Sequence, residues 1–285
     1  MSFHQPPNVH VDHVHLNVCD LERSIRFYRD VIGFSVLDRE GNVARLTADG
    51  RRALVTLEQP EGAAPKPAGT TGLYHFALLL PSREHLAQIV LHFAGLNMPL
   101  GHSDHLVSEA LYLNDPDGNG IEIYRDREPS EWTWQGGEVR MAVDPLDFRS
   151  LLAGVQRRPW EKLPDGTIIG HIHLHVSRLD EAETFYTDGL GFEVVNRYGG
   201  HALFLSTGRY HHHIGLNTWQ GVGAPTPPEN SVGLREFTVV YPDAEARDRA
   251  ADRLRTIGAD VSEKDGAVLA ADPSGNRIRL SAGSQ

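Results

Sequence analysis

Cysteine is nearly missing from this 285-residue chain, which contains only Cys19. A single cysteine cannot form a disulfide within the chain, so we expect a reducing, cytoplasmic location. The chain also lacks any uncharged apolar run near the roughly 18 residues that a membrane span needs. Residues 1–8 lack the apolar core of a signal peptide. The sequence therefore predicts no disulfide and no membrane partner.

An excess of basic residues is lacking as well. The 27 Lys and Arg residues are outnumbered by 38 Asp and Glu residues, and the formal net charge is −11. The basic residues are scattered, whereas a nucleic-acid-binding protein usually presents a basic face, so we expect no nucleic-acid partner. Histidine, in contrast, is abundant, with 16 residues, and this abundance is the first indication of chemistry.

An internal repeat organises the chain. The block His13–Leu21 (HVHLNVCDL) returns as His171–Leu179 (HIHLHVSRL), and Asp115–Glu122 (DPDGNGIE) returns as Asp272–Arg279 (DPSGNRIR). Blocks that recur in the same order indicate a duplication. With 100–200 residues typical of one domain, we expect two domains and a linker that packs against them, at residues 9–127, 168–285 and 128–167, respectively.

Each half divides again into two similar units. In the first unit, Val11–Val18 alternates as a strand should, and Asp20 is placed to cap a helix that ends at Gly33. Short strands follow, and a second unit of the same kind begins near Leu73. The sequence therefore predicts an α+β fold of four βαβββ modules, with mixed, curved sheets and the helices outside.

Three potential metal ligands share pocket-facing strand positions. His13 alternates with apolar neighbours, as do His75 and Glu122 in the second unit. If the two units of one half curve around a common cavity, these three side chains meet inside it. Two imidazoles and one carboxylate on one side of an ion form the facial triad that suits non-haem Fe(II). His15 competes with His13, but we expect it to line the pocket.

The repeated blocks resemble those of the vicinal oxygen chelate (glyoxalase/bleomycin resistance/extradiol dioxygenase) superfamily, most closely its two-domain catechol 2,3-dioxygenase-like branch. The resemblance implies a metal held by a His on the first strand of one unit, a His on the first strand of the next and a Glu on its last strand. His13, His75 and Glu122 occupy those positions. It also implies catalytic roles for Tyr112, ten residues before Glu122, and for His105, with His102 as the alternative to His105.

The second half departs from the family pattern. Its aligned positions hold His171, Glu236 and Arg279, and an arginine cannot bind a metal. Ile214 and Leu216 mark a buried strand face, so His211 and His213 are expected to point into a second pocket. The resemblance implies that His213 occupies the position of the family's catalytic base. We consider both a second metal site of His171, His213 and Glu236 and a polar pocket without metal.

Our leading hypothesis is an Fe(II)-dependent extradiol-type dioxygenase, an oxidoreductase of aromatic degradation, acting with O₂ on a small catechol or hydroquinone-like substrate. Mn, Ni and Zn are the alternative metals. A glyoxalase-like metal-dependent isomerase or lyase is the second hypothesis. Thr56 rather than Glu58 faces the pocket where such an enzyme needs a carboxylate, which disfavours it. A non-catalytic small-molecule-binding protein is the third, and the sequence leaves open whether the chain forms a homo-oligomer.

Overall fold

The computed structural model describes residues 3–264 and 266–283, and the chain forms four βαβββ modules as the sequence predicts. The N-terminal half contains β1 (His10–Asn17), α1 (Leu21–Phe27), β2 (Ser35–Glu40), β3 (Val43–Thr47) and β4 (Val55–Glu58), then β5 (Gly72–Leu79), α2 (Arg83–Gly95), β6 (Gly101–Asp104), β7 (Ser108–Asn114) and β8 (Gly120–Asp126). The C-terminal half contains β11 (Ile168–His175), α4 (Leu179–Thr184), β12 (Glu193–Tyr198), β13 (Ala202–Ser206) and β14 (Ile214–Asn217), then β15 (Gly233–Tyr241), α5 (Ala244–Thr256), β16 (Val261–Lys264), β17 (Ala267–Ala271) and β18 (Arg277–Ala282).

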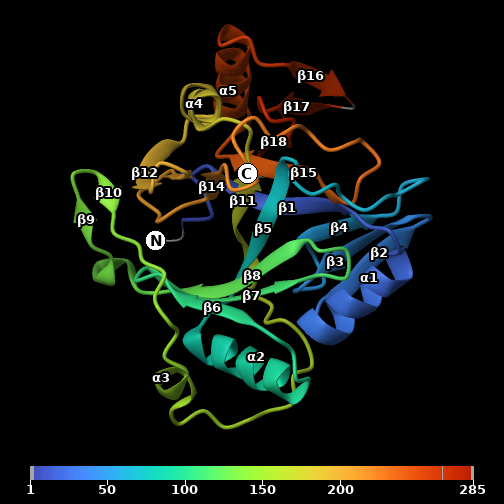
Figure 1. The fold of residues 1–285 in the computed structure, drawn as a ribbon, viewed down its shortest axis with the longest axis vertical. Helices are drawn as coiled ribbons and strands as arrows, with labels where there is room; N and C mark the ends of the chain where they lie inside the picture. The colour runs from blue at the N-terminus through green and yellow to red at the C-terminus, as the bar shows by residue number, and fades with distance from the viewer. Residues whose placement is uncertain (1–2, 265, 284–285) are drawn as a thin grey trace.

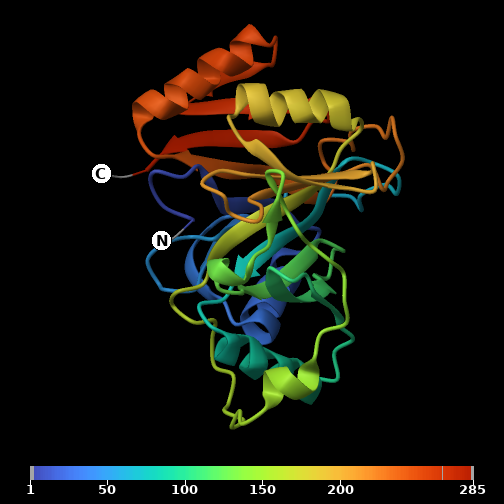
Figure 2. The same cartoon turned by 90° about the vertical axis from the view of Figure 1, so that its left-hand side faces the viewer.

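The helices lie outside the sheets, toward opposite ends of the molecule. Helices α4 and α5 cover one end, with α2 at the other and α1 to its side (Figure 1). Figure 2 shows α4 and α5 side by side over the strands of the C-terminal half. Fully buried side chains such as Phe93 of α2 and Leu254 of α5 attach these helices to the sheets. None of the helices within the described residues is long and apolar enough to cross a membrane.

The first helix begins and ends where the sequence predicts. The Asp20 side chain accepts a hydrogen bond from the backbone N–H of Arg23, which satisfies one of the free donors of the first turn. The helix then widens into a π-helical turn, η1 (Tyr28–Ile32), and stops at Gly33 with a φ of 104°. A Cβ at Gly33 would lie 2.7 Å from Nε1 of Trp160, so close packing as well as backbone conformation requires glycine there.

Each large sheet takes one module from each half. One eight-stranded sheet has the order β16-β17-β18-β15-β1-β4-β3-β2, and the other has the order β12-β13-β14-β11-β5-β8-β7-β6. The first module therefore pairs with the fourth through antiparallel β1 and β15, and the second pairs with the third through β5 and β11. The two units of one half therefore do not curve around a common cavity, as the grouping of His13 with His75 and Glu122 required, because the repeat identifies equivalent modules but not which strand edges pair.

The repeated sequence motifs connect the two modules within each half. The hydroxyl of Tyr28, at the end of the first helix, donates to the Asp115 carboxylate at 3.0 Å, and Tyr186 donates to Asp272 at the same distance. Each Asp also accepts backbone N–H bonds within its own Asp-Pro-x-Gly-Asn turn, for example from Asn119. These buried contacts explain why each half repeats the same two motifs although the sheets join different halves.

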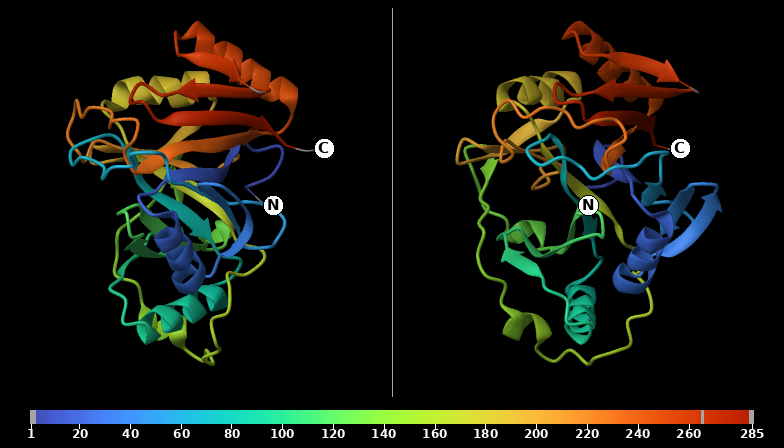
Figure 3. Two further views of the ribbon diagram at one scale, coloured as in Figure 1. Left: turned by 90° about the vertical axis from the view of Figure 1, so that its right-hand side faces the viewer. Right: turned by 45° about the vertical axis from the view of Figure 1, so that its right-hand side comes forward.

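The segment between the halves runs along the outside of the molecule and holds η2 (Pro129–Glu131), β9 (Trp134–Gln135), β10 (Glu138–Val139) and α3 (Phe148–Leu152) (Figure 3). Trp132 is buried with its ring near those of Phe3 and Tyr210, at centroid distances of 5.4 and 5.8 Å. Residues 141–143 of this segment lie against the concave face of the second sheet, where they line a cavity.

Candidate active site

A cavity of about 420 Å³ opens on the sheet formed by the second and third modules. That volume suits a small organic ligand. Its polar wall contains Glu122, Tyr112, Ser103 and five histidines, namely His75, His102, His105, His173 and His212. Its apolar wall contains Tyr74, Met141, Ala142, Val143, Tyr198, Phe204 and Trp219. The cavity therefore combines a histidine-rich floor with an aromatic and apolar wall.

His75, Glu122 and His171 converge beside this cavity, and the first two of them line it. Their strands are adjacent, because β5 carries His75 and lies between β8, with Glu122, and β11, with His171. The Glu122 Oε2 atom lies 3.0 Å from His75 Nε2 and 3.1 Å from His171 Nε2, and the two nitrogens are 3.3 Å apart. Atoms bound octahedrally to one ion at roughly 2.1 Å lie about 3 Å apart, so this spacing fits a single metal.

The donor set is buried and has the protonation that a metal requires. Glu122 and His171 are 2% and 0% exposed. Burial lowers the pKa of His171 to about 4, so its imidazole is neutral at neutral pH. Burial alone would raise the pKa of Glu122, but His171 and His75 outweigh it and hold that pKa well below its usual value. A carboxylate and a neutral imidazole are the ligand forms that bind divalent ions.

His13 is not part of this triad, so the expectation that it is the third ligand is wrong. It lies on β1 in the other sheet, where its Nε2 is hydrogen-bonded to the Thr56 hydroxyl at 2.8 Å. His171, expected in a second pocket, takes its place instead. The exchange follows from the module pairing, because His13 and His171 occupy equivalent positions of the repeat. Only the module that pairs with the second one can bring its histidine to His75.

The other sheet contains the equivalent of this site without its metal chemistry. Strand register places His13, Glu236, Arg279 and Thr56 where the first site has His171, His75, Glu122 and Gly215. The Arg279 guanidinium donates to the Glu236 carboxylate at 2.8 Å. A cavity of about 440 Å³ is lined by both of these residues and by His15. The expected grouping of Glu236 with His171 and His213 is therefore wrong, because Glu236 shares its site with His13.

We expect Arg279→Glu to create a second metal site in this sheet. The substitution removes a positive charge from the position where an ion would bind and adds a carboxylate beside His13 and Glu236. The two carboxylates repel each other, and a divalent cation bound between them relieves that repulsion. Metal analysis after dialysis is expected to rise from one to two ions per chain. The neighbouring Arg277→Glu, which alters an exposed pair with Glu229, is the charge-matched control. An unchanged metal content in Arg279→Glu would contradict this account.

Tyr112 and His105, which the family resemblance implied as a catalytic pair, lie together on the cavity wall. Tyr112 on β7 faces Glu122 across the strand pair, and its hydroxyl lies 2.5 Å from His105 Nε2. His105 Nδ1 donates to the Ala142 carbonyl at 2.7 Å, so its Nε2 accepts the hydrogen bond from Tyr112. Burial, with the Glu122 charge, raises the pKa of Tyr112 well above its usual value and keeps it a phenol. His102 instead accepts from the backbone N–H of Leu146.

His212, which sequence reasoning missed, lines the cavity in place of His211 and His213. Its ring packs on that of His171, with a centroid distance of 4.1 Å. Strand β14 begins only at Ile214, so the alternation used to orient the preceding histidines does not extend to them. His213 points away and is hydrogen-bonded to the Phe3 carbonyl at 3.1 Å. The expectation that His211 and His213 face a second pocket is therefore wrong.

A hydrogen-bonded chain connects His212 to Asp126. His211 Nε2 lies 2.7 Å from Asp126 Oδ1, and His211 Nδ1 lies 2.8 Å from His212 Nδ1. A carboxylate accepts, so His211 uses its single N–H on Asp126 when it is neutral. His212 Nδ1 then donates to His211, which leaves the Nε2 lone pair of His212 free as an acceptor. The chain of contacts thus fixes the tautomer of a cavity-wall histidine.

Comparison with known proteins gives the same two repeats. Residues 10–123 and 168–280 match the model of the Glyoxalase/Bleomycin resistance protein/Dioxygenase superfamily. The chain is 47% identical over 277 residues to Catechol-2,3-dioxygenase of Bacillus subtilis (strain 168), which covers 95% of this chain and 96% of that protein. The match extends across both halves and the segment between them.

Solved structures show the same fold. A putative dioxygenase from Bacillus subtilis subsp. subtilis str. 168 superposes with a TM-score of 0.69 at 14% identity, covering 97% of this chain and 86% of that chain. Glyoxalase I from Zea mays superposes with a TM-score of 0.58 at 15% identity, covering 95% and 92%. At such low identity these similarities establish architecture, and the chemistry depends on the side chains of the site.

Proposed function

This chain belongs to the Glyoxalase/Bleomycin resistance protein/Dioxygenase superfamily, and on that premise we propose that it is an Fe(II)-dependent extradiol-type dioxygenase. Its substrate is a catechol or hydroquinone-like aromatic, which it cleaves with O₂. The similarity to a catechol-2,3-dioxygenase along nearly the whole chain supports the reaction class. The observation that carries the proposal is the buried triad of His75, Glu122 and His171 beside an aromatic-walled cavity.

The triad determines what a bound metal can do. His75, His171 and Glu122 would hold the ion from one side, and two imidazoles with one carboxylate are the donor set of non-haem Fe(II) oxygenases. Iron held there would supply the redox centre for the reaction of a catechol with O₂. The protein positions the ligand atoms and excludes water from the site, because His171 is fully buried and apolar side chains form part of the cavity wall.

The cavity wall favours an uncharged aromatic substrate. Among the described residues that line it, Glu122 is the only acidic one and none is Lys or Arg. Tyr74, Tyr198 and Trp219 are 40%, 49% and 48% exposed, and they offer ring surfaces on which an aromatic ring can pack. A substrate with its own carboxylate would lose hydration there without gaining a cationic partner. The substrate class is therefore a neutral diol.

Two groups that line the cavity are placed to move protons. His212 Nε2, oriented by His211 and Asp126, accepts a proton from a substrate hydroxyl. The Tyr112 hydroxyl, which donates to His105 Nε2, accepts a hydrogen bond from a substrate hydroxyl and relays a proton to His105 during ring opening. Both groups lie beside the triad, since His212 packs on His171 and Tyr112 faces Glu122.

The proposed function is tested with protein purified anaerobically and loaded with Fe(II). Oxygen uptake is measured on catechol, substituted catechols and hydroquinones, with ¹⁸O₂ to trace the product. We expect one O₂ consumed per substrate and both labelled atoms in the ring-opened product, with no turnover of the Zn-loaded protein. Failure of the iron-loaded protein to consume O₂ with any of these substrates would overturn the proposal.

We expect Tyr112→Phe to retain metal and fold while lowering turnover by about 10–1000-fold, as expected for a positioned proton-transfer group. Only the hydroxyl bonded to His105 is removed, and the ring stays packed. His105→Ala is expected to act in the same direction, with less than additive loss in the double variant. Tyr198→Phe, the same change at the exposed cavity rim, is the matched control. Wild-type turnover in Tyr112→Phe would show that this tyrosine is structural.

The site lacks a group that a glyoxalase-like isomerase needs. Such an enzyme needs a carboxylate near the metal to take a proton, but strand register places Gly215 at the position equivalent to Thr56 of the other sheet. A Cβ at Gly215 would lie 2.8 Å from the His173 ring, so this position has no room for a side chain. Glu58, considered earlier for this role, lies in the other sheet beside Arg235.

A further inference from the structure

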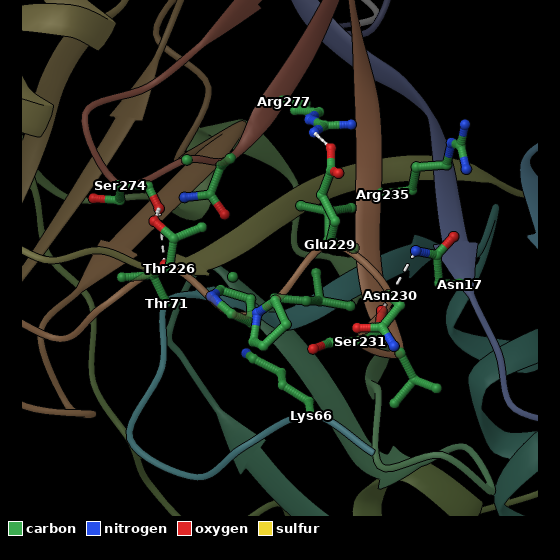
Figure 4. A pocket seen from close by; sticks show the side chains of 18 of the residues that line it. Asn17, Lys66, Thr71, Thr226, Glu229, Asn230, Ser231, Arg235, Ser274 and Arg277 are labelled. Carbon is green, nitrogen blue, oxygen red and sulfur yellow. Dashed lines mark hydrogen bonds and ion pairs between the residues drawn. The ribbon is translucent and has the colours of Figure 1, made fainter. Parts of the chain in front are cut away.

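A third cavity, of about 370 Å³, lies apart from the active site (Figure 4). It is formed where β1 ends and β5 and β15 begin, against the two Pro- and Gly-containing loops that precede β5 and β15. It shares no lining residue with the active-site cavity. Its polar lining includes Asn17, Lys66, Arg235, Asn276 and Arg277, and its apolar lining includes Pro227, Pro228, Val232 and Leu234.

Lys66 is the unusual group in this pocket. Within residues 3–264 and 266–283, its ammonium has neither an ion pair nor a hydrogen bond. The side chain lies against the start of β5, where a Cβ on Gly72 would be only 3.0 Å from Lys66 Nζ. Burial lowers the pKa of Lys66 to about 8, and no acidic group opposes this effect. Lys66 is partly buried, and an ammonium partly withdrawn from water without an anion is disfavoured relative to one that pairs with a ligand anion.

The other charged groups of the pocket do not compensate Lys66. Arg277 is paired with Glu229 at 2.5 Å, and Arg235 is paired with Glu58 at 3.0 Å. Figure 4 shows the Arg277–Glu229 pair across the pocket from Lys66. With both arginines paired to carboxylates, the uncompensated positive charge of the lining is that of Lys66. A cation on a concave surface attracts anions to it.

A buried amide adds a second unsatisfied group. Asn17 is 5% exposed, and within the described part of the chain its Oδ1 has no hydrogen-bond partner. Its Nδ2 donates to the Ser231 carbonyl at 3.4 Å, on the same wall of the pocket. The Asn17 Oδ1 atom is itself enclosed, so it is Lys66 that offers donors, three of them, to a ligand oxyanion.

We propose that this pocket binds a small organic anion whose carboxylate or phosphate pairs with Lys66 and whose carbon skeleton packs on Pro227, Pro228 and Leu234. The volume leaves room for a skeleton beyond the charged group. A carboxylate and a phosphate ester present the same oxyanion chemistry to Lys66. The ligand is distinct from the neutral aromatic that the active-site cavity accepts.

The proposal is tested by amine labelling, because the sequence contains only three lysines, Lys66, Lys162 and Lys264. The full-length protein is treated at pH 8 with a limiting acylating reagent, and each lysine is quantified by peptide mass spectrometry. Benzoate, phenyl phosphate and inorganic phosphate are the probes, with neutral benzyl alcohol as the control. We expect an organic anion to slow labelling of Lys66 by about fivefold, the effect at pH 8 of a rise in its pKa from about 8 to about 9. Lys162, exposed and paired with Asp165, is expected to be unaffected.

Titration calorimetry of Lys66→Met provides the second measurement, with Lys162→Met as the matched control. We expect the binding of the protecting anion to be lost in Lys66→Met and unchanged in Lys162→Met. Protection by phenyl phosphate but not by benzoate would identify a phosphate ester as the ligand class, and the reverse would identify a carboxylate. Equal labelling of Lys66 with and without all three probes, or equal anion binding by Lys66→Met and wild type, would overturn the proposal.

Discussion

Replacing His171 by Ala is expected to abolish both metal binding and ring cleavage, whereas replacing His13 by Ala leaves both intact. His171 supplies one of three donors, and its Nε2 lies within 3.3 Å of the other two donor atoms. Two remaining ligands hold a divalent ion poorly and leave its position undefined. The measurements are metal content per chain after dialysis and oxygen uptake with catechol.

His13→Ala is the matched control because it removes the same residue type at the equivalent position of the repeat. His13 contacts Thr56 rather than the triad, so its loss removes one hydrogen bond, which contributes about 1 kcal/mol to stability. We expect this variant to unfold at a slightly lower temperature and to turn over at the wild-type rate. Loss of metal from His13→Ala with retention in His171→Ala would contradict the module pairing described above.

Replacing His212 by Asn is expected to leave the metal in place and to lower turnover by about 10²–10⁴-fold, the usual contribution of a positioned general base. The substitution removes the free Nε2 acceptor of a side chain that lines the cavity. It does not alter the three donor atoms of the triad. Single-turnover kinetics with iron-loaded protein, together with metal analysis, separate this loss from a loss of iron.

His213→Asn is the control for His212→Asn. The two histidines are adjacent and buried, but His213 is bonded to the Phe3 backbone and lies outside the cavity lining. We expect His213→Asn to be less stable and to retain turnover per folded, metal-loaded molecule. The opposite ranking, with His213→Asn inactive and His212→Asn active, would restore His213 as the base that the family resemblance implied.

Local sequence patterns predict the modules and a large part of the site. Asp20 caps the first helix and Gly33 ends it, as expected. Alternation along single strands placed His75 and Glu122 toward one cavity, and the structure brings them within 3.0 Å. These features depend on neighbouring residues or on one strand and its partner, so a short stretch of sequence is sufficient to indicate them.

Local sequence patterns could not predict that His171, rather than His13, joins His75 and Glu122. Both histidines begin the same repeated block, and both have pocket-facing parity on the first strand of a module. Which one reaches His75 depends on whether β5 pairs with β1 or with β11, a choice made between elements roughly 100 residues apart. Strand propensity and periodicity are the same for both alternatives, so nothing local distinguishes them.

His212 was missed for a different reason. Its orientation depends on contacts with His211 and His171 in an irregular segment before β14, where no strand period applies. Met141 and Val143 were missed because they belong to the segment between the halves, which has little periodicity. The catalytic groups and the substrate-facing wall are thus partly built by residues that only the folded chain brings together.

The most direct test of the central claim is anomalous diffraction at the iron absorption edge from crystals of the iron-loaded protein. The account predicts one strong peak per chain, within bonding distance of His75 Nε2, His171 Nε2 and Glu122 Oε2, and none beside His13, Glu236 and Arg279. That peak would show that one module from each half builds the metal site. A peak at His13, or one bound by His75 and Glu122 without His171, would contradict the account.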